Sequence, residues 1–200
     1  MISPSNLAGI ILAAGYSSRM HQFKPLLPLG KSTVIETAID GFIEAGIGNI
    51  VVVIGHNAEA LKPLLDHKKI QWVYNSRFDE GMFTSILAGL NALEKSVHGF
   101  LLLPADIPLV KKKTINQLCE AFDSSNKDII YPVYLGRRGH PPIISAKMFP
   151  EILKYDGTGG LKALLKTYGD RAFHVEVDDE GVLLDMDQYE DYMKLCMYHS

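Results

Sequence analysis

The chain has few cysteines, little net charge and no long run of apolar residues. Its two cysteines, Cys119 and Cys196, lie far apart without C-x-x-C or histidine spacing, so we expect unpaired thiols in a reducing compartment. A formal net charge of −3 gives no sequence-wide electrostatic footprint for nucleic acid or an anionic membrane. No apolar run reaches spanning length, and the amino terminus lacks signal-peptide features. We expect a soluble, cytoplasmic protein with neither nucleic acid nor membrane as a partner.

Two well-known phosphate-binding signatures are also missing. Gly30, Lys31 and Ser32 look like the end of a Walker A loop, but the residue five positions before Gly30 is Pro25 rather than glycine. No G-x-G-x-x-G follows the first apolar segment, so a dinucleotide site of the NAD type has no local support. The basic run 111–113 is better explained as a solvated helix start than as a binding patch.

Apolar strand patterns alternate with amphipathic helix patterns along the chain. In the first part we expect strands near 8–13, 50–54, 70–74 and 99–103, and helices near 32–46, 57–65, 82–95 and 111–123. This order predicts an α/β fold of three layers, with a mostly parallel, Rossmann-like sheet covered on both faces. A length of 200 residues, 47% hydrophobic and 22% charged, suits a single domain over 1–200.

The last part of the chain predicts further strands near 128–133, 142–144, 173–177 and 181–185, and a helix near 159–168. We expect 174–177 and 182–184 to pair as a hairpin. The acidic residues 178–180, followed by Gly181, would then form its turn rather than a metal site.

The segment 10–15 is the first candidate site. The apolar residues 10–12 end in Ala13, Ala14 and Gly15, as a buried parallel strand does before the loop that usually holds a ligand. Small residues let backbone N–H groups approach anionic oxygens closely. The Arg19 guanidinium could donate hydrogen bonds to two phosphate oxygens at once, and the Lys24 ammonium could act as a point charge. The pattern is typical of a triphosphate site, although an ordinary strand, turn and helix with surface cations would look similar.

The same stretch resembles the signature of the MobA-like nucleotidyltransferases, and most closely that of the molybdenum cofactor cytidylyltransferases. The signature is L-A-A-G-x-S-x-R-M, then a lysine and L-L-P; residues 12–20 read LAAGYSSRM and residues 24–28 read KPLLP. His21 stands where the family usually has glycine, so the loop between Arg19 and Lys24 is expected to differ in shape. The resemblance implies the fold of nucleotide-diphospho-sugar transferases. It implies that these residues bind the nucleotide: Leu12, Ala13, Ala14, Gly15, Arg19 and Lys24.

Two aspartates are the expected metal ligands. Asp106 follows the apolar residues 100–103 within L-P-A-D-x-P, which matches the family's metal-binding segment, although an aspartate capping a turn would fit the residues alone. Magnesium prefers one or two carboxylates together with substrate phosphates. Residues 185–191 resemble the family's D-x-D-T-P-E-D, with Gln188 and Tyr189 replacing Thr-Pro. The resemblance makes Asp187 the second Mg²⁺ ligand, and strand alternation would place Asp185 on the same side.

The expected nucleobase side consists of Asn75, Gly81 and Ser85, which resemble the family's N…G-M-x-x-S segment. Gly81 would admit the base plane, and the Ser85 hydroxyl would reach its edge. Without the resemblance, this segment would be only a helix start. Ala14 matches the L-A-A-G of pyrimidine-using relatives rather than the L-A-G-G of guanylyltransferases, and its methyl group would disfavour a purine.

The expected acceptor side includes His140 and Lys162. His140 lies in a G-H-P segment that resembles the cytidylyltransferase branch, although a histidine before two prolines is often structural. Lys162 stands where relatives often have arginine. The positive charge is kept, but the planar guanidinium that could donate two parallel hydrogen bonds is lost.

The resemblance implies a nucleotidyltransferase that uses CTP and Mg²⁺ to convert molybdopterin carrying molybdenum into its cytosine dinucleotide. Arg19, Lys24 and Asp106 would be catalytic, and a molybdoenzyme or its chaperone would receive the product. Three alternatives remain open. They are another triphosphate such as GTP, another acceptor such as a sugar or alditol phosphate, and a non-catalytic nucleotide-binding module for cofactor delivery.

Overall fold

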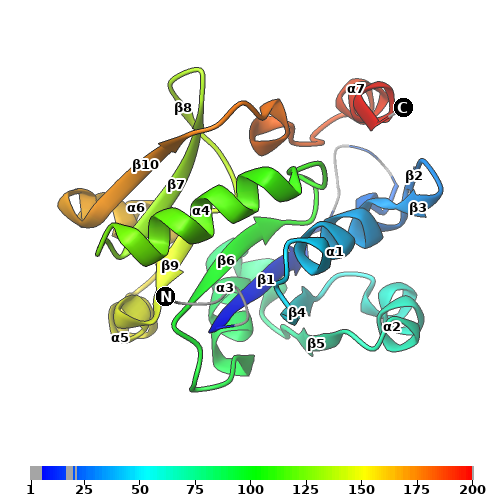
Figure 1. Ribbon diagram of the computed structural model, residues 1–200. Helices are drawn as coiled ribbons and strands as arrows, with labels where there is room; N and C mark the ends of the chain where they lie inside the picture. The colour runs from blue at the N-terminus through cyan, green and yellow to red at the C-terminus, as the bar shows by residue number, and fades with distance from the viewer. Residues whose placement is uncertain (1–5, 17–19, 21, 200) are drawn as a thin grey trace.

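The computed structural model describes residues 6–16, 20 and 22–199. Its main sheet has the strand order β10-β7-β9-β6-β1-β4-β5, with β8 paired to β7 (Figure 1). The pairs β1–β4, β1–β6, β4–β5 and β7–β10 are parallel, whereas β9 runs antiparallel to β6 and β7. The strands of this sheet are β1 (Leu7–Ala13), β4 (Asn49–Ile54), β5 (Gln71–Tyr74), β6 (Gly99–Pro104), β7 (Ile129–Tyr134), β8 (Arg137–Arg138), β9 (Ile143–Ser145) and β10 (Ala172–Glu176).

Helices cover both faces of the sheet, which confirms the predicted mostly parallel α/β fold. In β1, Leu7 and Ile11 face one core and Ile10 and Leu12 the other, because strand side chains alternate. Helices α1, α2 and α4 pack on the first face, and α3, α5 and α6 on the second. The helices are α1 (Val34–Glu44), α2 (Ala58–His67), α3 (Met82–Ala92), α4 (Lys112–Ser124), α5 (Phe149–Lys154), α6 (Gly160–Lys166) and α7 (Tyr189–His199). Within the described residues, no helix combines the length and apolar character needed to cross a bilayer.

A small third core joins the carboxyl-terminal segment to the segment that follows the first strand. Leu29 of the short hairpin β2 (Pro28–Leu29) and β3 (Ser32–Thr33) packs with Met186 and Leu195. Tyr192 of α7 donates its hydroxyl hydrogen to the Pro28 carbonyl at 2.6 Å. This packing holds the segment before α7 beside the 3-10 helix η2 (Lys24–Leu26), which directly precedes β2.

The predicted hairpin between 174–177 and 182–184 is wrong. Strand β10 pairs in parallel with β7, and residues 180–183 form the 3-10 helix η6 (Glu180–Leu183). The buried Asp179 accepts hydrogen bonds from Thr114 Oγ1 at 2.6 Å, Lys111 N at 2.9 Å and Gly181 N at 3.0 Å. These bonds attach the chain at Asp179 to the start of α4. The acidic residues therefore do form a turn, but a 3-10 helix follows it instead of the predicted strand.

The prediction that Asp185 and Asp187 share one side of a strand end is also wrong. Residues 184–187 have no regular secondary structure, because the chain leaves η6 and runs toward α7. Asp185 is exposed, Met186 is fully buried, and Asp187 is half-buried. The buried methionine anchors this segment instead of a strand ladder.

Candidate functional site

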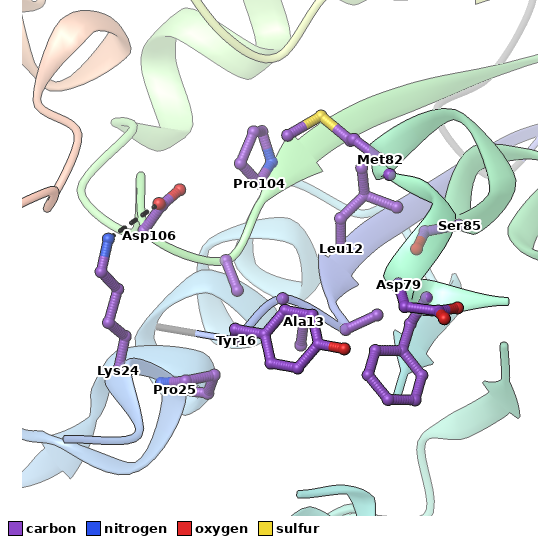
Figure 2. Close-up of a pocket in the computed structure, with 15 residues that line it drawn as sticks. Leu12, Ala13, Tyr16, Lys24, Pro25, Asp79, Met82, Ser85, Pro104 and Asp106 are labelled. Carbon is purple, nitrogen blue, oxygen red and sulfur yellow. Dashed lines mark ion pairs between the residues drawn. The ribbon is translucent and has the colours of Figure 1, made fainter. Parts of the chain in front are cut away.

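A cavity of about 360 Å³ lies at the carboxyl ends of β1 and β6 and beside the start of α3 (Figure 2). Parallel α/β sheets bind ligands at this edge because several strand ends and their loops meet there. The lining residues are Leu12, Ala13, Ala14, Gly15, Tyr16, Lys24, Pro25, Phe78, Asp79, Gly81, Met82, Ser85, Pro104, Ala105 and Asp106. The backbone couples the two central strands at this point, where Ala105 N donates to the Leu12 carbonyl at 3.0 Å.

The cavity brings together most of the residues predicted to bind a nucleotide. The predicted residues that line it are Leu12, Ala13, Ala14, Gly15, Lys24, Gly81, Ser85 and Asp106. Arg19 and His21 lie outside the described residues. The remaining predicted residues, which are not part of the lining, are Asn75, His140, Lys162 and Asp187.

Lys24 lies between the two predicted metal ligands. Its Nζ is 3.6 Å from Asp106 Oδ2 and 3.4 Å from Asp187 Oδ1. The Lys24 side chain is only 11% exposed, against 30% for Asp106 and 45% for Asp187. Figure 2 shows Lys24 and Asp106 pointing toward each other across one end of the cavity. A partly buried cation with two carboxylates makes this the charged end of the site.

Asp106 experiences opposing electrostatic effects. Burial raises the pKa of its carboxyl group, because a charged carboxylate loses hydration there, while the Lys24 ammonium opposes that rise in pKa. Asp185 and Asp187 add to the rise, since like charges disfavour ionisation. The main chain supports this clustering, because Met186 N donates to the Asp106 carbonyl at 3.0 Å.

The donor set at this end suits a hard divalent cation. Asp106 and Asp187 offer carboxylate oxygens to one central position, which the Lys24 ammonium already contacts. Within the described part of the chain, no group of three or more His, Cys, Asp or Glu is arranged to hold a metal. Magnesium accepts such a site, because it often takes one or two carboxylates and completes its shell with water and substrate phosphates.

The other end of the cavity is formed by the start of α3. Gly81 has φ 106°, a conformation that favours glycine, and a Cβ there would meet nothing within 4 Å. Ser85 is buried and lines the cavity. The buried Asn75 donates through Nδ2 to Ser85 Oγ and to Thr84 Oγ1, both at 2.9 Å. Asn75 therefore orients Ser85 from behind.

His140 is not part of the cavity lining. Its Nδ1 is 3.5 Å from the Leu102 carbonyl, and its backbone N donates to the Val182 carbonyl at 2.9 Å. Burial lowers the pKa of the imidazole, while the Leu102 carbonyl and the negative charge of Asp185 oppose that shift. Lys162 is exposed on α6 and takes no part in the lining.

Several lining residues were not predicted from the sequence, among them Tyr16, Phe78 and Asp79. Tyr16 occupies the first variable position of L-A-A-G-x-S-x-R-M. Only its neighbours in the signature indicated that it could line the site. Phe78 lies in the 3-10 helix η3 (Phe78–Glu80), three residues before the predicted Gly81. An aromatic residue so close in sequence to a predicted base site could have been identified as a candidate lining residue.

Comparison with known proteins identifies relatives over nearly the whole chain. A family model described as MobA-like NTP transferase domain matches residues 9–172. The molybdenum cofactor cytidylyltransferase of Escherichia coli (strain K12) is 28% identical over 185 residues, which are 92% of this chain and 92% of that protein. The nicotine blue oxidoreductase of Paenarthrobacter nicotinovorans is 27% identical over 197 residues, covering 94% of this chain and 96% of that protein.

Solved structures share the fold. The crystal structure of Rv0371c from Mycobacterium tuberculosis H37Rv superimposes with a TM-score of 0.83 at 26% identity, covering 98% of this chain and 100% of that one. Another structure of Rv0371c, a complex with manganese, has a TM-score of 0.75 at 24% identity and covers 96% of this chain and 98% of that one.

Proposed function

The chain belongs to the MobA-like NTP transferase family, and we propose that it transfers CMP from CTP to molybdopterin carrying molybdenum, with release of pyrophosphate. The observation that carries this proposal is the position of Lys24 between Asp106 and Asp187, at one end of a cavity whose other end carries Ser85 and Asp79. A nucleoside triphosphate suits this arrangement, because its phosphates need a cation and a metal ion at one end and its base has hydrogen-bonding groups at the other.

The reaction forms one bond and breaks another. A terminal phosphate oxygen of the acceptor attacks the α-phosphorus of CTP, and the bond from that phosphorus to the α,β-bridging oxygen breaks. The attacking phosphate is already anionic, so no residue has to remove a proton from it. Lys24, together with Arg19, offsets the negative charge that grows on the departing pyrophosphate.

Asp106 and Asp187 would hold Mg²⁺ beside the phosphates. When bound, the ion supplies charge neutralisation at the phosphate oxygens. Asp106 follows β6 and Asp187 lies in the segment before α7, and the hydrogen bond from Tyr192 to Pro28 helps to hold that segment near Lys24 and Asp106.

Support for CTP as the donor comes from Ala14 and from the Escherichia coli relative, which is a cytidylyltransferase. Ala14 is buried and is one of the residues that line the cavity, beside Gly15. A methyl group on the floor narrows the space for a base, which favours a pyrimidine over a purine by steric exclusion.

The acceptor would approach from the side of His140, where the imidazole lies near Asp185 and the carboxylates. His140 and Lys162 are proposed to bind the acceptor, and a molybdoenzyme or its chaperone to receive the product. The expected compartment is the cytoplasm. The presence of both Asp106 and Asp187 beside Lys24 favours an enzyme over a non-catalytic delivery module, because a module that has lost turnover need not keep both metal ligands.

The test is pyrophosphate release with Mg²⁺ and each of CTP, GTP, UTP and ATP, with and without molybdenum-loaded molybdopterin. We expect release only with CTP and this acceptor together. Release with GTP at an equal rate would contradict the choice of donor. Release only when a sugar or alditol phosphate replaces molybdopterin would contradict the acceptor and leave the nucleotide half intact.

A further inference from the structure

Three aromatic rings meet at the cavity, and the reaction proposed above assigns none of them a role. Tyr16 follows β1, His56 follows β4, and Phe78 follows β5, so all three come from loops at the carboxyl edge of the sheet. The ring centroids lie 4.8 Å apart for Tyr16 and His56, 5.4 Å for Tyr16 and Phe78, and 6.2 Å for His56 and Phe78. We call these residues the aromatic cluster. Tyr16 and Phe78 line the cavity directly.

The backbone holds the aromatic cluster in place. His56 N donates to the Ala14 carbonyl at 3.1 Å, which ties the loop after β4 to the loop after β1. A Cβ at Gly55 would lie 2.7 Å from Phe78 Cβ and 2.9 Å from Ala14 Cβ, so only glycine allows this close approach. The rings are thus positioned before any ligand binds.

Tyr16 remains 51% exposed despite its contacts with two other rings. Figure 2 shows it between Lys24 and Asp106 on one side and Asp79 and Ser85 on the other. An exposed aromatic face attracts planar, apolar groups and has no charge with which to bind phosphate. The part of a nucleoside triphosphate that matches this face is the base.

We propose that Tyr16 stacks on the base of the bound nucleoside triphosphate, with His56 and Phe78 as positioning residues behind it. This inference rests on the proposed function, because it takes a nucleoside triphosphate as the ligand. Every base has a π-face, so the stack adds affinity for all four triphosphates and does not choose among them. Selection among the bases would come from residues that limit the size of the base or contact its edge, such as Ala14 and Ser85.

The test compares ligands with and without a base. Calorimetry would measure the affinity of wild-type protein, Tyr16→Leu and Tyr16→Phe for CTP, GTP and inorganic tripolyphosphate, all with Mg²⁺. Stacking on an aromatic side chain contributes about 1–3 kcal/mol per base, so Tyr16→Leu should weaken CTP and GTP by roughly 5- to 150-fold. Tripolyphosphate binding should not change, and Tyr16→Phe should keep wild-type affinity. Phe173→Leu is the matched control, because Phe173 is 43% exposed on β10 and does not line the cavity.

A spectroscopic measurement tests the contact itself. In the wild-type complex, the ring current of Tyr16 should move the cytosine H5 and H6 resonances of CTP upfield, and Tyr16→Leu should remove that shift. His56→Ala should reduce the shift and weaken CTP without affecting tripolyphosphate, as expected of a residue that acts through Tyr16.

Three results would overturn the proposal. They are unchanged CTP and GTP affinity in Tyr16→Leu, an equal loss of tripolyphosphate binding in that variant, and wild-type protein that binds tripolyphosphate as tightly as CTP. Wild-type protein that binds no triphosphate would overturn the proposed function as well. Binding of GTP alone, with the same dependence on Tyr16, would contradict the CTP donor and support the stacking.

Discussion

Lys24 Nζ lies 3.4 Å from Asp187 Oδ1 and also reaches Asp106, so an ammonium group stands where a divalent ion would meet both carboxylates. The lysine and the metal would therefore compete for the same oxygens until triphosphate draws the lysine away. The attraction is strong enough to matter, since two unit charges about 4 Å apart interact by about 4 kcal/mol near a protein surface.

Removal of the lysine charge should strengthen metal binding in the absence of nucleotide. We expect Lys24→Gln to bind Mn²⁺ on the order of tenfold more tightly than wild type, equivalent to about 1.4 kcal/mol. Electron paramagnetic resonance of free Mn²⁺ at pH 8 would measure this. The exposed Lys31, changed to glutamine, is the control for a general charge effect. Unchanged or weaker Mn²⁺ binding in Lys24→Gln alone would contradict the competition.

Loss of the Asp106 carboxylate should remove most of the turnover. We expect Asp106→Ala to lower the rate of pyrophosphate release by roughly 10²- to 10³-fold, the scale of losing a key electrostatic group, with an unchanged circular dichroism spectrum. Asp170→Ala is the control, because Asp170 is exposed just before β10, at the opposite edge of the sheet. A variant of Asp106 that turns over normally would exclude this residue from the mechanism.

The sheet and the small residues that end its first strand could be predicted from the sequence for a simple physical reason. Buried parallel strands are short apolar runs, and the small residues that end β1 leave a recognisable break in the pattern. The failed hairpin shows the limit of such patterns. Asp179 meets Thr114 across 65 residues of sequence, and a local pattern cannot reveal a hydrogen bond of that range.

The proposed metal site shows the same limit. Lys24 and Asp187 are separated by 163 residues, and their contact depends on α7 packing against the β2–β3 hairpin. Nothing in the composition of either segment predicts that packing, so only the family resemblance brought the two residues together. The family match over residues 9–172 confirms that resemblance, while the role of each site residue stays a proposal.

Ala14 should control the size of base that the cavity accepts. With wild-type protein, we expect turnover with CTP to exceed turnover with GTP by a wide margin. Ala14→Gly should raise the ratio of GTP to CTP turnover severalfold, because it removes the methyl group of a buried residue that lines the cavity. Steady-state rates with each nucleotide would measure the ratio. Equal rates for the two nucleotides in wild-type protein would contradict the steric explanation.

Cys119 should be chemically silent in the folded protein. Cys119 lies on α4 and is buried in the core that this helix covers. Burial raises the pKa of its thiol to about 11, so almost no reactive thiolate exists at pH 8. In a Cys196→Ser variant, Cys119 is the only cysteine. We expect a disulfide reagent such as Ellman's to label this variant slowly when folded and rapidly in denaturant. Fast labelling of the folded variant would contradict the buried position.

His140 should make the protein less stable in mild acid. Burial lowers the pKa of its imidazole below the ordinary value of 6.5, so the unfolded chain binds a proton more readily than the folded one. The neutral imidazole therefore favours folding fully above about pH 6.5, and this contribution is lost as the pH falls through the folded pKa. His140→Asn cannot take up the proton, so its free energy of unfolding should change less than that of wild type between pH 7.5 and pH 5.5. Urea denaturation at both pH values would measure the difference. An equal decrease in the free energy of unfolding of the two proteins would contradict the role of His140. The acid sensitivity would then come from other groups, such as His174, whose pKa is also lowered by burial.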